Sequence, residues 1–287
     1  MSRSVVKLDP WIGLRRHTDA RIALGRAGQS LPTAAHLEFQ LAHAQARDAV
    51  HARVDWTRLE EEMSALAVPS VRLHSEASDR ITYLQRPDFG RRLDESSRQA
   101  LQDLSSGLAA RPIEYAGDGQ RVRFDVGFVL ADGLSACAIQ RQAVPTLAAI
   151  LPALRASGWR VAPTALVEQG RVAVGDEVGA LLEVAITVVL IGERPGLSSP
   201  DSLGIYLTHD PRVGMSDAAR NCISNVRPAG LAPALAADKL LYLLRESRHR
   251  RISGVALKDE ASPSIGTDSH CGNFLIAESL PVLSESE

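Results

Sequence analysis

Three short loops hold the residues of this chain that could do chemistry. They are Asp132-Gly133-Leu134-Ser135, Gly170-Arg171-Val172 and Gly192-Glu193-Arg194-Pro195-Gly196, and each follows a stretch that predicts a β-strand. In a parallel sheet, ligands bind at the carboxyl ends of the strands, where such loops gather. Glycines near Glu193 let the backbone approach a ligand closely, and a carboxylate accepts hydrogen bonds from amides or hydroxyls. The pattern predicts a ligand site at Glu193; alternatively, Glu193 and Arg194 only pair with their neighbours and shape a turn.

The same loops leave open a self-sufficient α/β enzyme, in which Asp132, Ser135 and Glu193 act as acid–base or nucleophilic groups. A serine nucleophile after a strand usually lies in the pattern G-x-S-x-G, but residues 133–137 read Gly-Leu-Ser-Ala-Cys. We therefore expect Ser135 to cap a helix. The chain also lacks the G-x-G-x-x-G and G-x-x-x-x-G-K-S/T fingerprints of nucleotide-binding proteins.

Neither the cysteines nor the histidines have the spacing of a metal site. The cysteines are Cys137, Cys222 and Cys271, and their isolation predicts reduced thiols and no structural zinc. The histidines that share one predicted helix are His36, His43 and His51. They lie about two turns apart, which is too far for one metal ion. Cys222 lies in a polar stretch, where it fits either a structural thiol or a residue that lines a ligand site.

Charge and hydropathy exclude several classes of protein. The 287 residues include 32 basic and 34 acidic side chains, and the net charge of −2 does not favour a nucleic-acid partner. The longest strongly apolar run, residues 184–192, is far shorter than the roughly 20 residues of a membrane-spanning helix. The first residues lack the apolar core of a signal peptide. We therefore expect an unexported protein with neither a nucleic-acid nor a membrane partner.

Alternating strands and helices must position the three loops. Apolar runs predict strands at 126–130, 160–168, 185–191 and 204–208. Helical patterns fall at 136–157, 176–184 and 233–248. Such alternation is typical of a parallel sheet with helices on both faces. We therefore predict an α/β domain at residues 113–258.

The first third of the chain predicts helices instead, at 33–52, 57–67 and 95–109. In the first of these, a stripe of apolar residues is expected to be buried. The stripe consists of Leu37, Leu41, Ala44 and Val50. We therefore predict a helical N-terminal domain at residues 1–112. The tail, residues 259–287, is rich in Ser, Gly and acidic residues without periodicity, and we expect it to be disordered.

Several stretches of the sequence together resemble the small (light) subunit of ethanolamine ammonia-lyase. The N-terminal stretches are residues 20–28 (ARIALGRAG), 75–79 (SEASD) and 84–92 (LQRPDFGRR). The later stretches are residues 132–135 (DGLS), 170–172 (GRV), 192–197 (GERPGL), 221–225 (NCISN) and 253–255 (SGV). The resemblance extends over residues 9–258, and so many matches in the same order make it specific.

The resemblance implies a fold, a reaction and a partner. The family subunit has a helical N-terminal domain followed by a Rossmann-like domain. Its enzyme uses adenosylcobalamin to convert ethanolamine to acetaldehyde and ammonia. The large subunit, a TIM barrel, holds the substrate and the catalytic residues, so none is expected on this chain. Cobalamin lies between the subunits of the hetero-oligomer, base-on, with its own dimethylbenzimidazole on cobalt.

Residue by residue, the resemblance implies three cofactor contacts. Val172 packs against the cofactor, Glu193 accepts hydrogen bonds from it, and Cys222 lines the same pocket. It also implies that the helical N-terminal domain docks on the large subunit. The arginines expected on that docking surface are Arg21, Arg26, Arg86, Arg91 and Arg92.

The resemblance further implies a bacterial microcompartment as the location, and otherwise the cytoplasm. Some relatives have a long N-terminal extension that affects solubility or packaging. Here, few residues precede Asp9-Pro10-Trp11.

Overall fold

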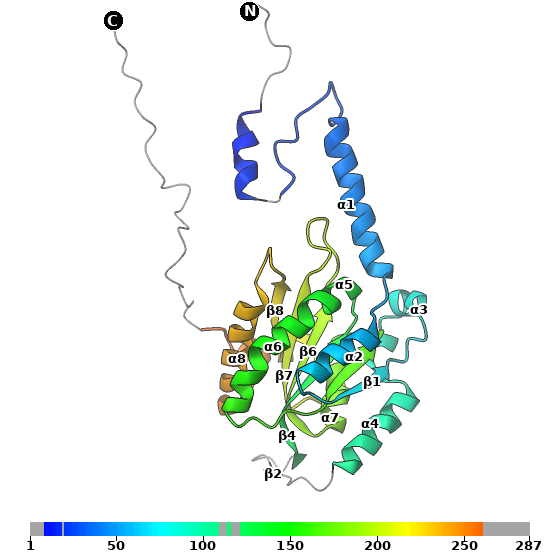
Figure 1. The fold of residues 1–287 in the computed structure, drawn as a ribbon, viewed down its shortest axis with the longest axis vertical. Coiled ribbons are helices and arrows are strands. Elements are labelled where there is room, and N and C mark those ends of the chain that lie inside the picture. Colours follow the sequence, from blue (N-terminus) through cyan, green and yellow to red (C-terminus); the bar gives the residue numbers. More distant parts are fainter. Residues whose placement is uncertain (1–8, 19, 109–113, 116–120, 261–287) are drawn as a thin grey trace, which may run out of the picture.

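A six-stranded sheet forms the centre of the protein (Figure 1). The computed structural model describes residues 9–18, 20–108, 114–115 and 121–260. The strand order is β1-β5-β4-β6-β7-β8. These strands are β1 (Ser70–His74), β4 (Phe124–Ala131), β5 (Thr164–Glu168), β6 (Val184–Gly192), β7 (Leu203–His209) and β8 (Arg220–Val226). A separate antiparallel pair consists of β2 (Glu114–Tyr115) and β3 (Arg121–Val122).

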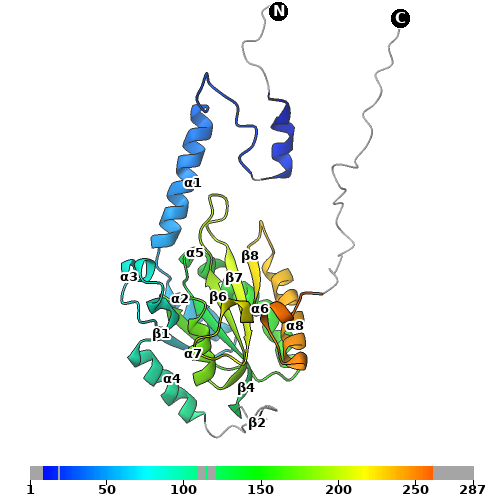
Figure 2. The same ribbon diagram turned by 180° about the vertical axis from the view of Figure 1, so that it is seen from behind.

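Helices cover both faces of the sheet, as the alternating pattern predicts (Figures 1 and 2). One face is covered by α2 (Trp56–Ala65), α5 (Ala136–Ala138), α6 (Val144–Ala156) and α8 (Pro233–Arg250). The opposite face is covered by α4 (Glu95–Gly107) and α7 (Val174–Leu181). A π-helix at Ile139–Ala143 joins α5 to α6. Short 3₁₀ helices lie at Pro10–His17, Phe89–Arg91, Asp217–Ala219 and Gly254–Ala256.

The apolar run of β6 is buried because both faces of this strand are covered. Val188 and Leu190 belong to the core cluster under α6 and α8, whereas Val189 belongs to the cluster under α4 and α7. Side chains of a strand point alternately to the two faces, so a central strand needs apolar residues at every position. This is the physical basis for the strand predicted at residues 185–191.

The prediction that residues 1–112 are purely helical is wrong at β1. Ser70–His74 pairs in parallel with Thr164–Glu168 of β5 and forms one edge of the sheet. An edge strand is covered less than a central one, and within β1 only Leu73 is buried, so the short run gave no strong strand pattern. The sheet thus takes strands from both sides of the boundary expected near residue 112, which itself lies outside the described residues.

The expectation of a fully parallel sheet is also wrong. The strands β1, β5, β4 and β6 are parallel, but β7 is antiparallel to both β6 and β8. A parallel connection needs a crossover of a dozen or more residues, whereas residues 193–202 form a short link between neighbouring strands. Because β8 is a largely polar edge strand, its sequence did not predict a strand.

Helix α1 (Thr33–His51) stands away from the sheet, and only its C-terminal half approaches the body of the protein (Figures 1 and 2). The predicted buried stripe is therefore wrong for Leu37 and Leu41, which are 57% and 60% exposed. The buried residues of α1 are Ala42 and Ala49. A helix that leaves the body has no neighbour to cover its apolar residues, and exposed apolar groups of this kind are typical of interaction surfaces.

The short helix α3 (Arg80–Gln85) lies near the C-terminal end of α1. Within the part of the chain that the structure describes, no helix is long and apolar enough to cross a membrane. The predicted tail, residues 259–287, falls outside the described residues except for its first two. Of these, Asp259 accepts a hydrogen bond from Lys239 Nζ at 2.5 Å.

Candidate functional site

A pocket of about 420 Å³ lies at the carboxyl ends of β4, β5 and β6. All three loops singled out in the sequence contribute to its wall. The lining residues are Tyr83, Gly133, Leu134, Arg171, Val172, Ile191, Gly192, Glu193, Arg194, Tyr206 and Ser224. The structure therefore brings Val172 and Glu193 into one pocket, although 21 positions separate them in the sequence.

Two glycines allow the loops after β4 and β6 to pack directly against each other. Leu134 N–H donates a hydrogen bond to the carbonyl of Gly192 at 2.9 Å. A Cβ on Gly133 would overlap the Gly192 carbonyl, and a Cβ on Gly192 would overlap the Ser135 carbonyl. Gly133 also has a φ of +58°, which L side chains rarely adopt. Any side chain at either position would push apart the loops that form the pocket.

Glu193 lines the pocket, and residues at the start of β7 and on β8 hold its carboxylate by hydrogen bonds. Its Oε2 accepts hydrogen bonds from Ser202 Oγ at 2.5 Å and from Asn225 N–H at 3.3 Å. Its Oε1 accepts one from Ser224 Oγ at 2.7 Å. A carboxylate has about four acceptor positions, so one remains for a ligand. Glu193 thus pairs with its neighbours, as one interpretation of the sequence expects, and it also lines the pocket; the predicted ligand contact stays a prediction.

Val172 lines the pocket, and the residue before it, Arg171, anchors the loop after β5. Arg171 N–H donates to the carbonyl of Gly90 at 2.7 Å, and its Nη2 donates to the carbonyl of Tyr83 at 3.0 Å. The Arg171 guanidinium also lies over the Tyr83 ring, 4.1 Å from its centroid. Helix α7 begins two residues after Val172, at Val174. The loop therefore presents an apolar side chain from a fixed backbone.

Cys222 lies on β8 opposite Tyr206 of β7, so it is one residue removed from the pocket wall. The residue as a whole is exposed, while its sulfur atom is partly desolvated beside Tyr206. Burial of the sulfur atom is the main cause that raises the thiol pKa, the nearby Glu193 carboxylate raises it further, and a hydrogen bond with Tyr206 lowers it. At neutral pH Cys222 is therefore a neutral thiol beside Tyr206 and Glu193.

Asp132 and Ser135 bind backbone groups of the loops and do not form a nucleophilic pair. Ser135 Oγ donates to the carbonyl of Pro200 at 2.7 Å and accepts from Ala138 N–H at 3.2 Å, which confirms its predicted role as a helix cap. Asp132 Oδ1 accepts from Gly170 N–H at 3.1 Å. Burial raises the pKa of Asp132 to about 6, although Arg80 opposes the shift. The hydrogen bonds of Ser135 thus go to backbone groups and not to an acid or a base.

Sequence reasoning missed the part of the pocket that comes from α3 and from the antiparallel strands β7 and β8. Tyr83 is fully buried and donates from its hydroxyl to the carbonyl of Gly170 at 3.2 Å. One local signal could have found α3, because Asp79 caps it by accepting from Thr82 N–H at 2.9 Å. Tyr206 and Ser224 come from strands whose pairing no local pattern predicts.

The described residues contain no group of three or more His, Cys, Asp or Glu side chains that could hold a metal ion. Of the histidines considered above, His36 forms a hydrogen bond with Gln40 at 2.9 Å, and the ring of His43 stacks beside that of Phe39. Cys271 lies outside the described residues.

Comparisons with known proteins point to one family. A family model described as ethanolamine ammonia-lyase light chain (EutC) matches residues 8–258. The chain is 56% identical to the ethanolamine ammonia-lyase small subunit of Azotobacter vinelandii over 278 residues. This alignment covers 96% of the present chain and 98% of the Azotobacter subunit. Over 272 residues it is 54% identical to the ethanolamine ammonia-lyase small subunit of Pseudomonas fluorescens, covering 93% and 95%. The resemblance found in the sequence is thereby confirmed, and the chain belongs to the ethanolamine ammonia-lyase light chain family.

Proposed function

We propose that this chain is the small subunit of an adenosylcobalamin-dependent ethanolamine ammonia-lyase, which converts ethanolamine to acetaldehyde and ammonia. Its role is to hold the cofactor against a large subunit that binds the substrate. The observation that supports this role most strongly is the single pocket shared by Val172 and Glu193. We assign no catalytic residue to this chain.

The pocket residues fit part of a corrinoid. The Val172 side chain offers an apolar surface to the cofactor. The remaining acceptor position of Glu193 suits an amide N–H group, and the side chains of the corrin ring carry several amides. A pocket of about 420 Å³ is near the small end of the range for drug-sized ligands. A corrinoid with its nucleotide is much larger, so most of it must be covered by another surface. This supports a composite site between two subunits.

The chemistry of the cofactor determines which tasks the protein residues perform and which the cofactor performs. Adenosylcobalamin, when bound, supplies the radical that starts the reaction. Glu193 and Val172 bind and orient the group, and Tyr206, with Cys222 beside it on the neighbouring strand, forms one side of the pocket. We propose base-on binding, because the described residues that line the pocket include no histidine that could replace the benzimidazole.

We propose that α1 and the segment before it dock on the large subunit. Their exposed apolar side chains are Trp11, Ile12, Leu31, Leu37, Phe39 and Leu41. The arginines implied by the resemblance differ in whether their side chains are already paired within this chain or exposed for contact with the large subunit. Arg92 is bound to Glu177 at 2.9 and 3.0 Å, and Arg86 pairs with Asp88 at 2.7 Å. Arg21, Arg26 and Arg91 are exposed, so these three arginines and the apolar side chains of α1 are the better candidates for the contact.

The resemblance also supports a microcompartment as the location, and otherwise the cytoplasm. Sedimentation of native extracts distinguishes the two, because a packaged subunit pellets with the shell and a cytoplasmic one stays in the supernatant.

The test of the proposed function is ammonia release from ethanolamine with adenosylcobalamin, measured with and without the large subunit. We expect activity only in the reconstituted pair. Turnover by this chain alone would favour the self-sufficient enzyme with Asp132, Ser135 and Glu193. No turnover by a verified, intact complex would overturn the proposal.

A further inference from the structure

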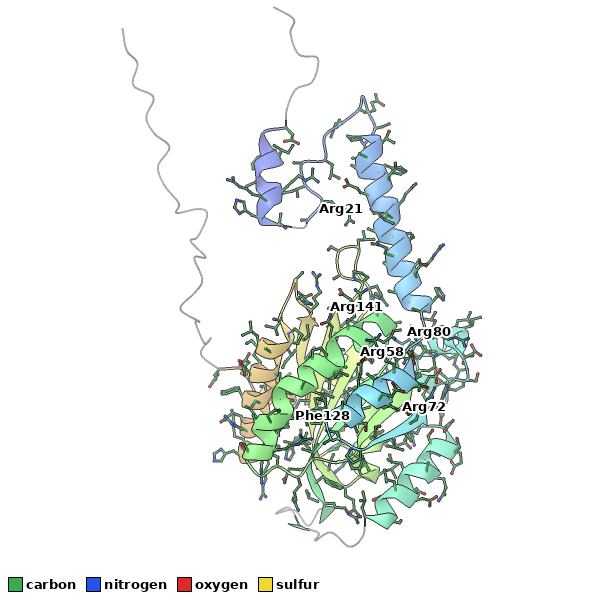
Figure 3. All side chains as sticks on the ribbon, viewed as in Figure 1. Arg21, Arg58, Arg72, Arg80, Phe128 and Arg141 are labelled. Carbon is green, nitrogen blue, oxygen red and sulfur yellow. The ribbon has the colours of Figure 1, made fainter. Side chains whose placement is uncertain are left out.

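Arg80 joins three segments that are far apart in the sequence. Its Nε donates to the carbonyl of Val50, in the last turn of α1, at 2.7 Å. Its Nη1 donates to the carbonyl of Gly133, in the loop after β4, at 2.8 Å, and to Gln169 Oε1 at 3.2 Å. Figure 3 shows Arg80 at the foot of α1, where this helix meets the body of the protein. The side chain is 14% exposed, so these bonds are shielded from water.

The same guanidinium supports the wall of the pocket. It lies 4.8 Å from the centroid of the Tyr83 ring, which lines the pocket and also contacts Arg171. Asp132 Oδ2 is 3.5 Å from Arg80 Nη1, and Asp132 in turn binds Gly170 N–H. Arg80 therefore contacts groups that position both loops beside Glu193 and Val172.

The remaining nitrogen of Arg80 argues against a purely stabilising role. Nη2 is buried, and no acceptor among the described residues lies within hydrogen-bond distance of it. A buried donor without a partner destabilises a fold. Features that break the rules of stable packing are concentrated at functional sites.

We infer that Arg80 is a positioning residue that couples the orientation of α1 to the geometry of the pocket. The inference rests on the proposed function, in which α1 docks on the large subunit and the pocket holds cobalamin. A planar guanidinium binds two carbonyls in a fixed relative geometry, so a shift of Val50 is transmitted to Gly133. Because coupling between two binding sites is reciprocal, docking of the large subunit tightens cofactor binding, and the cofactor tightens docking to the same degree.

The test compares three variants in the co-expressed complex of both subunits. Arg80→Met removes all the hydrogen bonds but keeps much of the side-chain volume. Arg80→Lys keeps the charge but cannot bridge both carbonyls. Arg58→Met is the control, since Arg58 is an exposed arginine of α2 that pairs locally with Glu62.

The first readout is hydrogen exchange of the assembled complex. We expect Arg80→Met to speed exchange in residues 132–135, 169–172 and 46–52 together, with β6 unchanged and Arg58→Met without effect. Arg80→Lys is expected to give a smaller change in the same peptides. Unchanged exchange in the two loops would overturn the inference. If Arg80→Met fails to assemble, the loop-selective change in Arg80→Lys decides the question.

The second readout separates positioning from general stability. We expect the dissociation constant for cobalamin, followed by its absorption spectrum, to rise at least about fivefold in Arg80→Met. The KM for ethanolamine and the kcat at saturating cofactor should stay unchanged. Glu193→Gln is the reference for weakened binding. If it weakens cofactor binding while Arg80→Met binds as tightly as wild type, the coupling between α1 and the pocket is refuted. If Glu193→Gln has no effect either, the proposed location of the cofactor is wrong.

Discussion

Asp176 of α7 and Arg220 of β8 form a buried, bidentate ion pair. The Nη1–Oδ1 and Nη2–Oδ2 distances are 2.6 and 2.7 Å, and both side chains are 2% exposed. Arg220 also donates to Thr208 Oγ1 at 3.0 Å. Since α7 begins directly after the Val172 loop and Arg220 shares a strand with Cys222, this pair fixes the relative position of two predicted cofactor contacts.

We expect Asp176→Asn to lower the free energy of unfolding by about 3–5 kcal/mol, because it leaves the buried Arg220 guanidinium without its counter-charge. The measurement is urea unfolding followed by circular dichroism. The control is Asp217→Asn, since Asp217 also contacts Arg220, at 3.4 Å, but is 91% exposed. Its effect should stay below about 1 kcal/mol. Equal effects of the two substitutions would show that burial does not set the strength of this pair.

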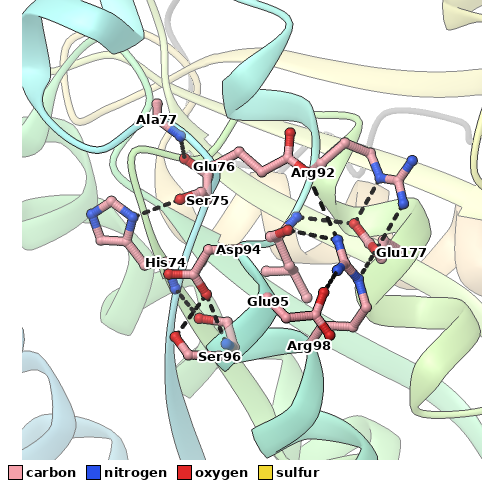
Figure 4. A network of polar contacts seen from close by, with 12 residues as sticks. His74, Ser75, Glu76, Ala77, Arg92, Asp94, Glu95, Ser96, Arg98 and Glu177 are labelled. Carbon is pink, nitrogen blue, oxygen red and sulfur yellow. Dashed lines mark hydrogen bonds and ion pairs between the residues drawn. The ribbon is translucent and has the colours of Figure 1, made fainter.

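Glu177, next to Asp176, provides a second prediction, for stability against pH. Burial opposes its ionisation, but hydrogen bonds from Arg92, from the Leu93 N–H and from Arg98 outweigh this effect and hold its pKa at about 2 (Figure 4). The folded pKa lies below the ordinary value of 4.5, so the stabilisation is present above pH 4.5 and is lost as the pH falls toward 2.

Glu177→Gln should therefore cost on the order of 3 kcal/mol of unfolding free energy at pH 7, and much less near pH 2 to 3. Unfolding curves of variant and wild type at several pH values give the difference. Glu76→Gln is the matched control, because Glu76 approaches Arg98 only to 3.8 Å and its side chain is 42% exposed. A difference between Glu177→Gln and wild type that does not change with pH would contradict this account.

The sequence predicted those parts of the site that depend on the sheet. Glu193 and Val172 follow apolar runs that end in glycine-containing loops, and the rule that ligands bind at strand ends was enough to select both loops. The choice of Val172 within its loop came from the resemblance. Cys222 could be selected only by resemblance. Its strand, with the sequence RNCISNV, is largely polar and lacks strict alternation, so nothing local showed that Cys222 pairs with Tyr206.

The remaining parts of the site depend on contacts between distant segments. Tyr83 lines the pocket and Arg80 supports its wall because α3 binds the loops after β4 and β5, and no periodicity encodes that contact. Leu37 and Leu41 show the opposite error. Their spacing is that of a buried helix face, but a sequence pattern cannot tell whether an apolar face is covered within its own chain or by another one.

Asp132 provides a third prediction, in which ionisation lowers the stability of the fold, whereas ionisation of Glu177 raises it. Burial raises its folded pKa to about 6 from an ordinary value of 3.8. The folded protein therefore binds the proton more tightly, and this group lowers stability as the pH rises from about 4 through 6. Asp132→Asn cannot ionise, and its amide oxygen still accepts a hydrogen bond from Gly170 N–H.

Relative to wild type, Asp132→Asn should thus gain on the order of 3 kcal/mol of unfolding free energy between pH 4 and pH 7. Thermal and urea unfolding across this range measure the difference. Asp201→Asn serves as the control, because Asp201 contacts only the exposed Arg141, at 3.4 Å. Parallel stability curves for Asp132→Asn and wild type would show that Asp132 is not the buried, weakly acidic group described above.

Glu193 provides the last prediction, for cofactor binding. Glu193→Gln replaces one acceptor oxygen by an N–H donor and disturbs the bonds with Ser202 and Ser224, so the group can no longer offer the same free acceptor position. A hydrogen bond to a charged group contributes about 1.5–3 kcal/mol, so we expect the dissociation constant for adenosylcobalamin to rise at least about tenfold in the assembled complex. Spectroscopic titration measures it. Glu61→Gln, on the exposed side of α2, is the control and should bind as wild type does. Wild-type affinity in Glu193→Gln would mean that the cofactor does not use this carboxylate, and the search for its polar contacts would move to Arg194 and Ser224.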